Sequence, residues 1–322
     1  MFGVSDDEKM LIEAVEELSN EVLEPQAAKT DETEEIPHDV IKALANMGVM
    51  GLNLPEEYGG PGISSVAMTH MVAAVAGGCG STASIVTAHY LATDSVLIGG
   101  TDEQKNAYLP RAASGEVIGA FGLTEPGAGS NPAEMSTKAV RTDNGWHLKG
   151  TKHFITNAGF ADFVVVYAIT DPEAGHRGIS AFLVDTAKVE GIVVGGHEKT
   201  MGLRGSPVYE ISFDCELPAD ALLGEEGQGF KTAMKVLDRG RIEVAAMSIG
   251  ISRKAMEHAV AWSKTRHING KPIAAMQAIA FKLADIYARY QQAFLVTMDA
   301  AHSRDTGAVS YTHLTLPTKR IV

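Results

Sequence analysis

The chain has 322 residues, of which 45% are hydrophobic and 21% charged, so it is long enough to form two or three compact domains. It carries 27 Lys and Arg against 40 Asp and Glu, which gives a net charge of -13. An acidic surplus of this size argues against a surface for nucleic acid or anionic membranes, because such surfaces select basic patches.

The two cysteines, Cys79 and Cys215, are too few for a cysteine metal cluster, and their separation favours a reducing compartment over a disulfide scaffold. Residues 1–10 are acidic and lack the apolar core of a signal peptide, and no uncharged run is long enough to span a bilayer. We therefore expect a location in the cytoplasm, or in the mitochondrial matrix if the protein is eukaryotic.

The first part of the chain is predicted to be helical, with Gly and Pro between the helices. From Ser5, which suits a helix N-cap, apolar residues recur every three or four positions as far as Pro25. A second helix is expected from Pro37 to near Gly48, since Pro favours the first turn of a helix and Gly the position after its end. Three further helices are predicted over 64–76, 81–98 and 102–114, the last capped by Asp102.

From Val117 the pattern changes to short runs rich in Val, Ile, Phe and Thr, which are typical of strands. Asp143, Asn144 and Gly145 form a tight-turn signal, and no crossover helix is indicated before Gly227. This organisation favours an antiparallel barrel or sandwich over a doubly wound parallel sheet. The runs lie at 117–124, 136–142, 162–170, 178–185 and 207–214.

Two long helices are predicted after the strands, over 228–264 and 274–304. The second carries residues at sevenfold spacing, as in the seam of a packed antiparallel bundle. Its members are Met276, Leu283, Tyr290 and Thr297, interleaved with Ala280, Tyr287, Phe294 and Ala301. A stripe of Met and aromatic residues is more typical of a core than of a ligand site, so we interpret it as core.

The most informative stretch is FGLTEPGAGS at residues 121–130. The small residues Gly127, Ala128 and Gly129 let main-chain N–H groups approach an anion or a ring edge closely. Taken alone, this stretch is as compatible with a plain glycine turn as with a phosphate cradle. It lacks the third glycine and helix of a dinucleotide fingerprint and the Lys of a P-loop.

Four further motifs follow: KHFITNA at 152–158, GHRGISAFLV at 175–184, KTMGLRGSPVYEISFD at 199–214 and LGEEGQGFKTAMKVLDRGRI at 223–242. In this order and spacing, the motifs resemble the acyl-CoA dehydrogenase family, and the match runs to about Ala308. The resemblance implies a multidomain α+β fold. Its parts are an N-terminal all-α domain over 1–116, a middle antiparallel β-barrel flavin domain over 117–224 and an incomplete C-terminal four-helix bundle over 225–308.

The resemblance implies FAD as the cofactor. Two triplets of residues would line its isoalloxazine: Phe121, Leu123 and Thr124 on one side, and Phe154, Ile155 and Thr156 on the other. Donors of the first triplet would lie near the pyrimidine edge, where negative charge collects on reduction. The Thr156 hydroxyl would bond near N5.

The resemblance also implies an acyl-CoA substrate and a neighbouring subunit. Ser130 would lie between the flavin and the CoA portion, which Asp238 and Arg241 would contact. Arg266 and Gln277 match positions that bind the flavin of a neighbouring subunit, so a homotetramer or homodimer is expected, and Arg266 could offer a bidentate fork to pyrophosphate. Composition alone would favour surface ion pairs or helix caps at these positions.

Three residues depart from the family pattern. Asn131 stands where the family usually has Asp, which puts flavin affinity in doubt. Ile268 and Asn269 replace the usual residues of the segment that contacts the neighbouring flavin, so those contacts are expected to be weaker or rearranged.

No catalytic residue is assigned, because the family's base is a Glu on a loop that would follow Ala308 and that loop is absent from this sequence. Some relatives carry this Glu just before the helix arginine, but that position is Gly240 here, and Glu243 is displaced from it on the helix. Glu125 is interpreted as a structural hydrogen-bonding residue rather than a general base. No metal site is expected, because no metal-ligand spacing joins His153, His197 and His267.

The tail, residues 309–322, matches no family motif and is interpreted as foreign or frameshifted sequence on a truncated chain. The alternative is a divergent tail that packs as a strand or stays disordered. Loss of the last helices would expose the seam at Met276, Leu283, Tyr290 and Phe294, from which we expect poor solubility or weak flavin retention.

Three functions are compatible with these patterns. The first is FAD-dependent α,β-dehydrogenation of an acyl-CoA thioester, as in fatty acid β-oxidation, with electrons passed to an electron-transferring flavoprotein. The second is a flavin-dependent oxidase or monooxygenase of the same fold. The third is a noncatalytic flavin- or CoA-binding fragment. Peroxide production in air distinguishes the second, and ligand binding without flavin bleaching distinguishes the third.

Overall fold

The computed structural model describes residues 3–307, and the chain divides into two compact units. The first unit takes in Met1–Ala27, Ile63–Ala83 and Arg241–Val322 as far as they are described, and the second takes in Ala28–Gly62 and Ser84–Gly240. The tail at 309–322 lies outside the described residues. No helix in the described part of the chain is both long and apolar enough to cross a membrane.

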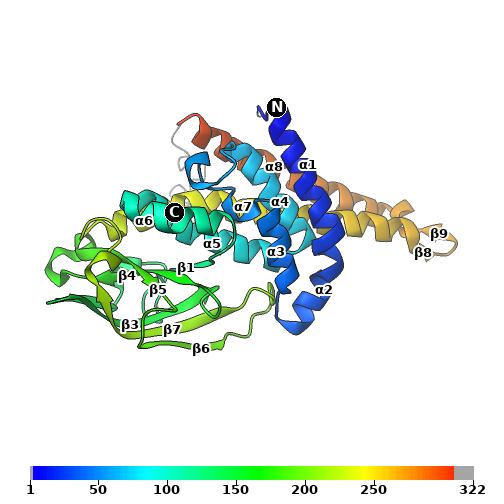
Figure 1. Cartoon of the computed structure of the whole chain (residues 1–322). Coiled ribbons are helices and arrows are strands. Elements are labelled where there is room, and N and C mark those ends of the chain that lie inside the picture. The colour runs from blue at the N-terminus through cyan, green and yellow to red at the C-terminus, as the bar shows by residue number, and fades with distance from the viewer. Residues whose placement is uncertain (1–2, 308–322) are drawn as a thin grey trace, which may run out of the picture. The chain divides into compact units, whose positions relative to one another are not determined.

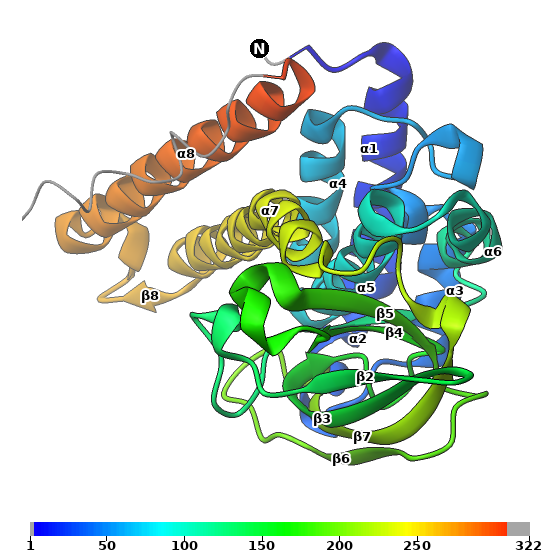
Figure 2. The ribbon, with the colours of Figure 1, turned by 90° about the vertical axis from the view of Figure 1, so that its left-hand side faces the viewer.

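The first unit is built of helices (Figure 2). Ser5 caps the first helix as predicted, since its hydroxyl accepts the Glu8 N–H while the Glu8 carboxylate accepts the Ser5 N–H. The elements are α1 (Asp6–Leu18), the π-helical turn η1 (Ser19–Leu23), α4 (Ser65–Gly78), the later part of α7 (Gly229–Thr265), β8 (His267–Ile268), β9 (Lys271–Pro272), the 3-10 turn η7 (Ile273–Ala275) and α8 (Gln277–Asp305). Their shared core gathers Val66, Ala73, Ile242, Ile249, Met298, Ala300 and Ala301.

The helical chain continues past Pro25, where the apolar period stops. The π-turn Ser19–Leu23 passes directly into α2 (Glu24–Thr33), which places Pro25 in the first turn of that helix. Proline has no N–H to donate and therefore interrupts the hydrogen bonds of a helix, and here it directly follows the π-turn, in which the Glu24 N–H donates to the Ser19 carbonyl five residues earlier. The sequence pattern does not reveal this continuation, because α2 is strongly polar.

The helices α7 and α8 confirm the two long helices expected, but Met276, Leu283, Tyr290 and Phe294 are not exposed as predicted. Leu283, Tyr290 and Phe294 are half-buried, because the last two pack against the core of the first unit, where Phe294 also meets the His70 ring at 5.7 Å. The large exposed apolar side chains of α8 are Tyr287, which belongs to the predicted seam, and Phe281, Ile286, Leu295 and Val296, which do not.

The second unit adds helices to a sheet. Its helical elements are α3 (His38–Asn46), the 3-10 turns η2 (Val49–Gly51) and η3 (Glu56–Tyr58), most of α5 (Gly80–Gly99), α6 (Asp102–Ala113) and the first part of α7. Thr101, not Asp102, is the N-cap of α6, since its hydroxyl accepts the Gln104 N–H. The Asp102 carboxylate belongs to the first turn, where negative charge is also favourable.

The strands form one mixed sheet, so the antiparallel expectation holds only for part of it. The strands are β1 (Gly119–Gly122), β2 (Lys138–Thr142), β3 (Gly145–Thr156), β4 (Phe163–Ile169), β5 (Ile179–Asp185), β6 (Ile192–His197) and β7 (Val208–Pro218). Their order is β1-β4-β2-β3-β7-β6, with β5 paired to β4. The β4 pairings with β1 and β2 are parallel.

The parallel pairings follow from the segment between β1 and β2, residues 123–137, which we call the crossover loop. It returns the chain so that β2 runs in the same direction as β1, the task that a helix performs in most parallel units. Because the crossover loop carries only the short 3-10 turn η4 (Pro132–Glu134), the sequence gives no sign of a crossover.

The alternating side chains of β4 fill two cores of the second unit. Phe163, Val165 and Tyr167 face α5 and α6, which cover one side of the sheet in Figure 1. Val164 and Val166 face the opposite side, where the core includes Trp146, Leu148, Phe182, Ile211 and Phe213. Residues buried on both faces explain the continuous apolar run of this strand.

A buried histidine ties α5 to the start of β1. His89 is 0% exposed, its Nδ1 accepts the Gly119 N–H at 3.0 Å, and its Nε2 lies 3.2 Å from the Ala112 carbonyl oxygen. This pair of partners requires the neutral Nε2–H tautomer. Burial lowers the pKa of His89 to about 4, although its bond to Ala112 opposes the shift.

The His89→Gln variant tests this state, because glutamine can keep both hydrogen bonds without titrating. Protonation below the ordinary pKa of 6.5 favours the unfolded chain, so the wild type loses stability as the pH falls from 6.5 to about 4. We expect a loss of about 3 kcal/mol across this window that the variant lacks. Urea unfolding at several pH values measures the difference, and parallel pH profiles for the two proteins would contradict it.

Gly119, at the start of β1, leaves no room for a side chain between α5 and β4. A Cβ there would lie 2.6 Å from both Ala92 Cβ and Phe163 Cζ, so Gly119→Ala forces the helix and the strand apart. We expect a loss of about 1–3 kcal/mol in the free energy of unfolding. Gly196→Ala in β6 is the control, since nothing lies within 4 Å of its added Cβ, and equal melting temperatures for both variants would refute the constraint.

Candidate functional site

The two segments predicted to face the flavin lie side by side in the second unit. The His153 N–H donates to the Thr124 carbonyl at 2.9 Å, and the Lys152 ammonium donates to the Leu123 carbonyl at 3.1 Å. The start of the crossover loop therefore runs along β3. The fold brings together two motifs that are well separated in the sequence.

A β-bulge in β3 separates the orientations of Phe154 and Ile155. The pairing of β3 with β7 shifts register between Lys152 and Ile155, and Phe154 adopts a left-handed φ of 57°. As a result, Phe154 is 59% exposed while Ile155 is 2% exposed. Bulges and positive φ values for bulky residues are found where a side chain must be aimed at a ligand.

Three hydroxyl groups around this junction are available to a ligand. Thr124, Ser130 and Thr156 have side chains that make no hydrogen bond within residues 3–307. Beside them, a Cβ on Gly127 or Gly129 would meet nothing within 4 Å, so the main chain of this loop is open to approach. Free donors beside an exposed aromatic face fit the edge and the plane of a flavin ring.

The wall behind the site is rigid. The Phe121 ring packs edge-on against Tyr167 at 5.3 Å, and the Tyr167 hydroxyl lies 3.0 Å from that of Ser95 on α5. Burial raises the pKa of Tyr167, so its hydroxyl stays neutral as a structural partner. Leu123 is buried in the same core.

Glu125 has a structural environment, as the sequence analysis expected. Its carboxylate accepts the Lys152 ammonium at 2.8 Å, the Ser136 N–H and hydroxyl at 2.6 and 2.7 Å, and the Thr137 N–H at 3.0 Å. Burial alone would raise the pKa of Glu125, but the Lys152 charge and these donors lower it to about 2. A carboxylate so weakly basic is a poor acceptor for a substrate proton.

The remaining predicted site residues are distributed over both units. Asp238 belongs to the second unit with the flavin segments, whereas Arg241, Arg266 and Gln277 belong to the first. Arg241, Arg266 and Gln277 are exposed, the last two at the end of α7 and the start of α8. Their roles remain predictions.

The packing of Gly240 bears on the alternative position for a base. A Cβ on Gly240 would lie 2.7 Å from Leu91 Cδ2, so any larger residue requires Leu91 to move. The position before Arg241, where some relatives carry the catalytic Glu, is therefore a glycine at which α7 packs closely against α5.

Sequence reasoning missed a buried polar cluster next to this position. Asp94 is 0% exposed and lies 3.0 Å from Arg239 Nε, while its other oxygen accepts the Asn53 amide at 2.9 Å. Arg239 also donates to the Asn53 carbonyl at 3.1 Å. The signal that could have revealed it is a lone Asp in the otherwise apolar helix over 80–99, since a buried charge requires a partner.

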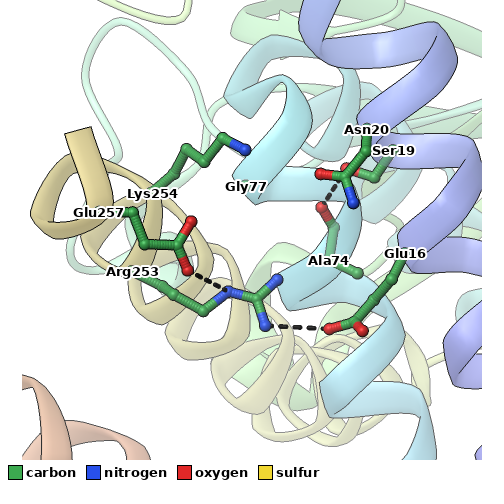
Figure 3. A pocket seen from close by; sticks show the side chains of 8 residues that line it. All are labelled: Glu16, Ser19, Asn20, Ala74, Gly77, Arg253, Lys254 and Glu257. Atoms are coloured by element: carbon green, nitrogen blue, oxygen red, sulfur yellow. Dashed lines mark hydrogen bonds and ion pairs between the residues drawn. The ribbon is translucent and has the colours of Figure 1, made fainter. Parts of the chain in front are cut away.

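A polar pocket of about 200 Å³ lies in the first unit (Figure 3). Its cations already have carboxylate partners, since Arg253 lies 3.0 Å from Glu16 and Lys254 lies 2.6 Å from Glu24. A pocket with compensated charges offers little attraction for the pyrophosphate of FAD. It contains none of the predicted flavin residues, so the candidate site is the junction of β3 and the crossover loop.

Comparison with protein families gives three matches along the chain. The N-terminal domain of acyl-CoA dehydrogenases matches residues 5–116, the middle domain matches 120–215, and the C-terminal domain matches 227–318. The third match extends into the segment 309–322. An acyl-CoA dehydrogenase of Bacillus subtilis is 39% identical over 94% of this chain and 80% of its own length.

Solved structures agree with these matches. The butyryl-CoA dehydrogenase of Megasphaera elsdenii superposes with a TM-score of 0.93 at 34% identity, over 97% of this chain and 83% of its own. A structure from a study of the electron transferring flavoprotein of Acidaminococcus fermentans and of flavin-based electron bifurcation superposes with a TM-score of 0.94 at 36% identity. The match covers 97% of this chain and 83% of that chain.

A third solved structure carries the cofactor. The glutaryl-CoA dehydrogenase of Mycobacterium smegmatis in complex with FADH2 gives a TM-score of 0.89 at 31% identity, over 95% of this chain and 78% of its own. The matches to all three family domains, the Bacillus subtilis relative and the structure with FADH2 agree with one another. The chain belongs to the acyl-CoA dehydrogenase family of FAD-containing oxidoreductases.

Proposed function

We propose that the protein catalyses α,β-dehydrogenation of an acyl-CoA thioester to the trans-2-enoyl-CoA, with electrons passed on to an electron-transferring flavoprotein. The observation that carries this proposal is the junction of β3 and the crossover loop, where free hydroxyls flank an exposed Phe154. A site built in this way holds the plane and the edges of an isoalloxazine at once.

The reaction removes a proton from the α-carbon and a hydride from the β-carbon of the acyl chain. FAD, when bound, supplies the hydride acceptor. Thr124 and Thr156 would orient the ring and stabilise the charge it gains, and Ser130 with Asp238 and Arg241 would hold the CoA portion of the substrate. The proposed base is a Glu that would follow residue 308 in the family pattern. Residues 309–322 contain no Glu, and none of the described residues is assigned that role.

Partners and substrate follow from the same resemblance. Arg266 and Gln277 would bind the flavin of a neighbouring subunit, so the active form would be a homotetramer or homodimer. The similarity to a structure described by an electron transferring flavoprotein supports such a protein as the electron acceptor. The similarity to a butyryl-CoA dehydrogenase supports a short or medium straight acyl chain. We propose a cytoplasmic location, or the mitochondrial matrix for a eukaryotic protein.

Anaerobic titration of the FAD-loaded full chain with butyryl-CoA and with octanoyl-CoA tests the reaction. We expect the visible absorbance of the oxidised flavin to bleach and the enoyl-CoA to appear in equal amount. Binding of the acyl-CoA without bleaching would instead identify the noncatalytic alternative. Rapid peroxide formation in air, with no transfer to an electron-transferring flavoprotein, would identify an oxidase.

Thr156→Val tests the placement of the flavin, because it removes a free hydroxyl while keeping the shape of the side chain. Loss of one hydrogen bond should raise the dissociation constant of FAD about three- to tenfold, with little change in the melting temperature of the apoprotein. Thr142→Val, in β2 of the same sheet, is the matched control. Equal FAD affinities for the two variants, measured by flavin fluorescence, would remove Thr156 from the site.

A further inference from the structure

Lys152 is a fully buried lysine in β3, two residues before Phe154. Its side chain is 0% exposed and that of its partner Glu125 is 2% exposed, with 2.8 Å between the ammonium and the carboxylate. Lys152 lies directly before the bulge that exposes Phe154, because the register of β3 shifts just after it.

Every partner of this ion pair belongs to the crossover loop. Besides Glu125, the Lys152 ammonium contacts the Leu123 carbonyl at 3.1 Å and the Met135 sulfur at 4.0 Å. The Glu125 carboxylate in turn accepts donors from Ser136 and Thr137. One lysine of β3 thus contacts both ends of the crossover loop, and through Glu125 it reaches the residues that lead into β2.

The middle of the crossover loop is mostly exposed but is held at one buried residue. Pro126, Gly127, Gly129 and Ser130 are exposed and the space beside both glycines is open, whereas Ala128 is 2% exposed and joins Glu125 through two main-chain hydrogen bonds. The exposed residues around this contact are expected to open locally unless the ends of the loop are fixed. The ion pair supplies that fixation where the loop meets β3.

Stability alone does not account for two buried charges. A buried ion pair is often no more stable than apolar side chains of the same volume, because each charge has lost its water, although removal of one partner is strongly destabilising. Such pairs are better explained by the geometry they impose, since a charge-assisted hydrogen bond fixes distance and direction more narrowly than an apolar contact.

We propose that Lys152 is a positioning residue that, through Glu125, locks the crossover loop against β3 and so fixes the distance between the two walls of the FAD site. The inference rests on the proposed flavin site for its consequence, but the lock itself is a property of the apoprotein. Lys152 acts through Leu123 and Glu125 and need not touch the cofactor.

The test uses the double variant Lys152→Met with Glu125→Gln. It removes both charges and leaves no unpaired charge in the core. The glutamine oxygen can accept the Ser136 N–H and hydroxyl in place of Oε2, but the Thr137 N–H loses the acceptor that Oε1 provided. We expect a folded protein whose melting temperature falls only by the loss of that one hydrogen bond, but whose FAD affinity is at least tenfold lower. Amide hydrogen exchange in residues 123–135 of the apoprotein should be at least tenfold faster.

A second readout separates positioning from simple support of the fold. If the crossover loop holds its donors against the flavin edge, loosening the loop weakens the reduced, negatively charged form more than the oxidised form. The midpoint potential of the bound flavin should therefore become more negative in the double variant. A role in stability alone would change the melting temperature and leave the potential unchanged.

The pair of Lys149 on β3 and Asp214 on the neighbouring strand β7 provides a matched control. Its atoms lie 2.7 Å apart, but both side chains are largely exposed. Lys149→Met with Asp214→Asn should leave the exchange rates, the FAD affinity and the potential at wild-type values.

The outcomes distinguish this inference from the proposed function. A wild type that binds no FAD would overturn the proposed function, and the exchange rates of the apoprotein would still decide whether the lock exists. A double variant that folds with wild-type exchange in residues 123–135 and wild-type FAD affinity would overturn the lock. If the double variant fails to fold, the single variant Lys152→Arg decides, because a larger cation in the same place should disturb the loop and the potential without removing the charge.

Discussion

The buried contact between the Lys152 ammonium and the Glu125 carboxylate is the interaction on which the middle of this protein depends. A parallel pairing of β1, β4 and β2 requires the chain to cross over between strands, and here the crossover has no helix to hold it. The ion pair replaces the missing helix as the link between the loop and the sheet. The ion pair fixes the distance and direction between the loop and β3. It contributes little net stability, because the energy gained from pairing is largely cancelled by lost hydration.

A second constraint acts where β3 continues beyond this pair. Without the bulge, alternation along β3 would place Phe154 on the same buried face as Lys152 and Ile155 on the opposite face. The one inserted residue reverses these positions, so that Ile155 is buried and Phe154 is exposed. The left-handed backbone at Phe154 is unfavourable for a bulky side chain, and the neighbouring contacts of Lys152 and His153 hold it in place. The left-handed backbone at Phe154 and the buried ion pair next to it together hold the Phe154 ring exposed beside the free hydroxyls.

The two units differ in how they manage charge. In the second unit, Asp94 and Glu125 are buried and each lies within 3.0 Å of a cation, Arg239 and Lys152 respectively. In the first unit, Arg253 and Lys254 pair with carboxylates that remain partly exposed, where such pairs contribute about 0–1 kcal/mol. Rigid geometry is therefore concentrated around the candidate flavin site.

The sequence by itself determined the helices, most strands and the family motifs, because helix caps, apolar period and turn residues are local features. It also indicated Thr124, Phe154 and Thr156, through motifs whose order is specific to the family. It could not predict the mixed sheet, the missed strand β6, the continuation of helix past Pro25 or the half-buried seam of α8. Strand direction, register shifts and the partner of a buried lysine are decided by residues distant in the chain, and only the tertiary structure joins Lys152 to Glu125.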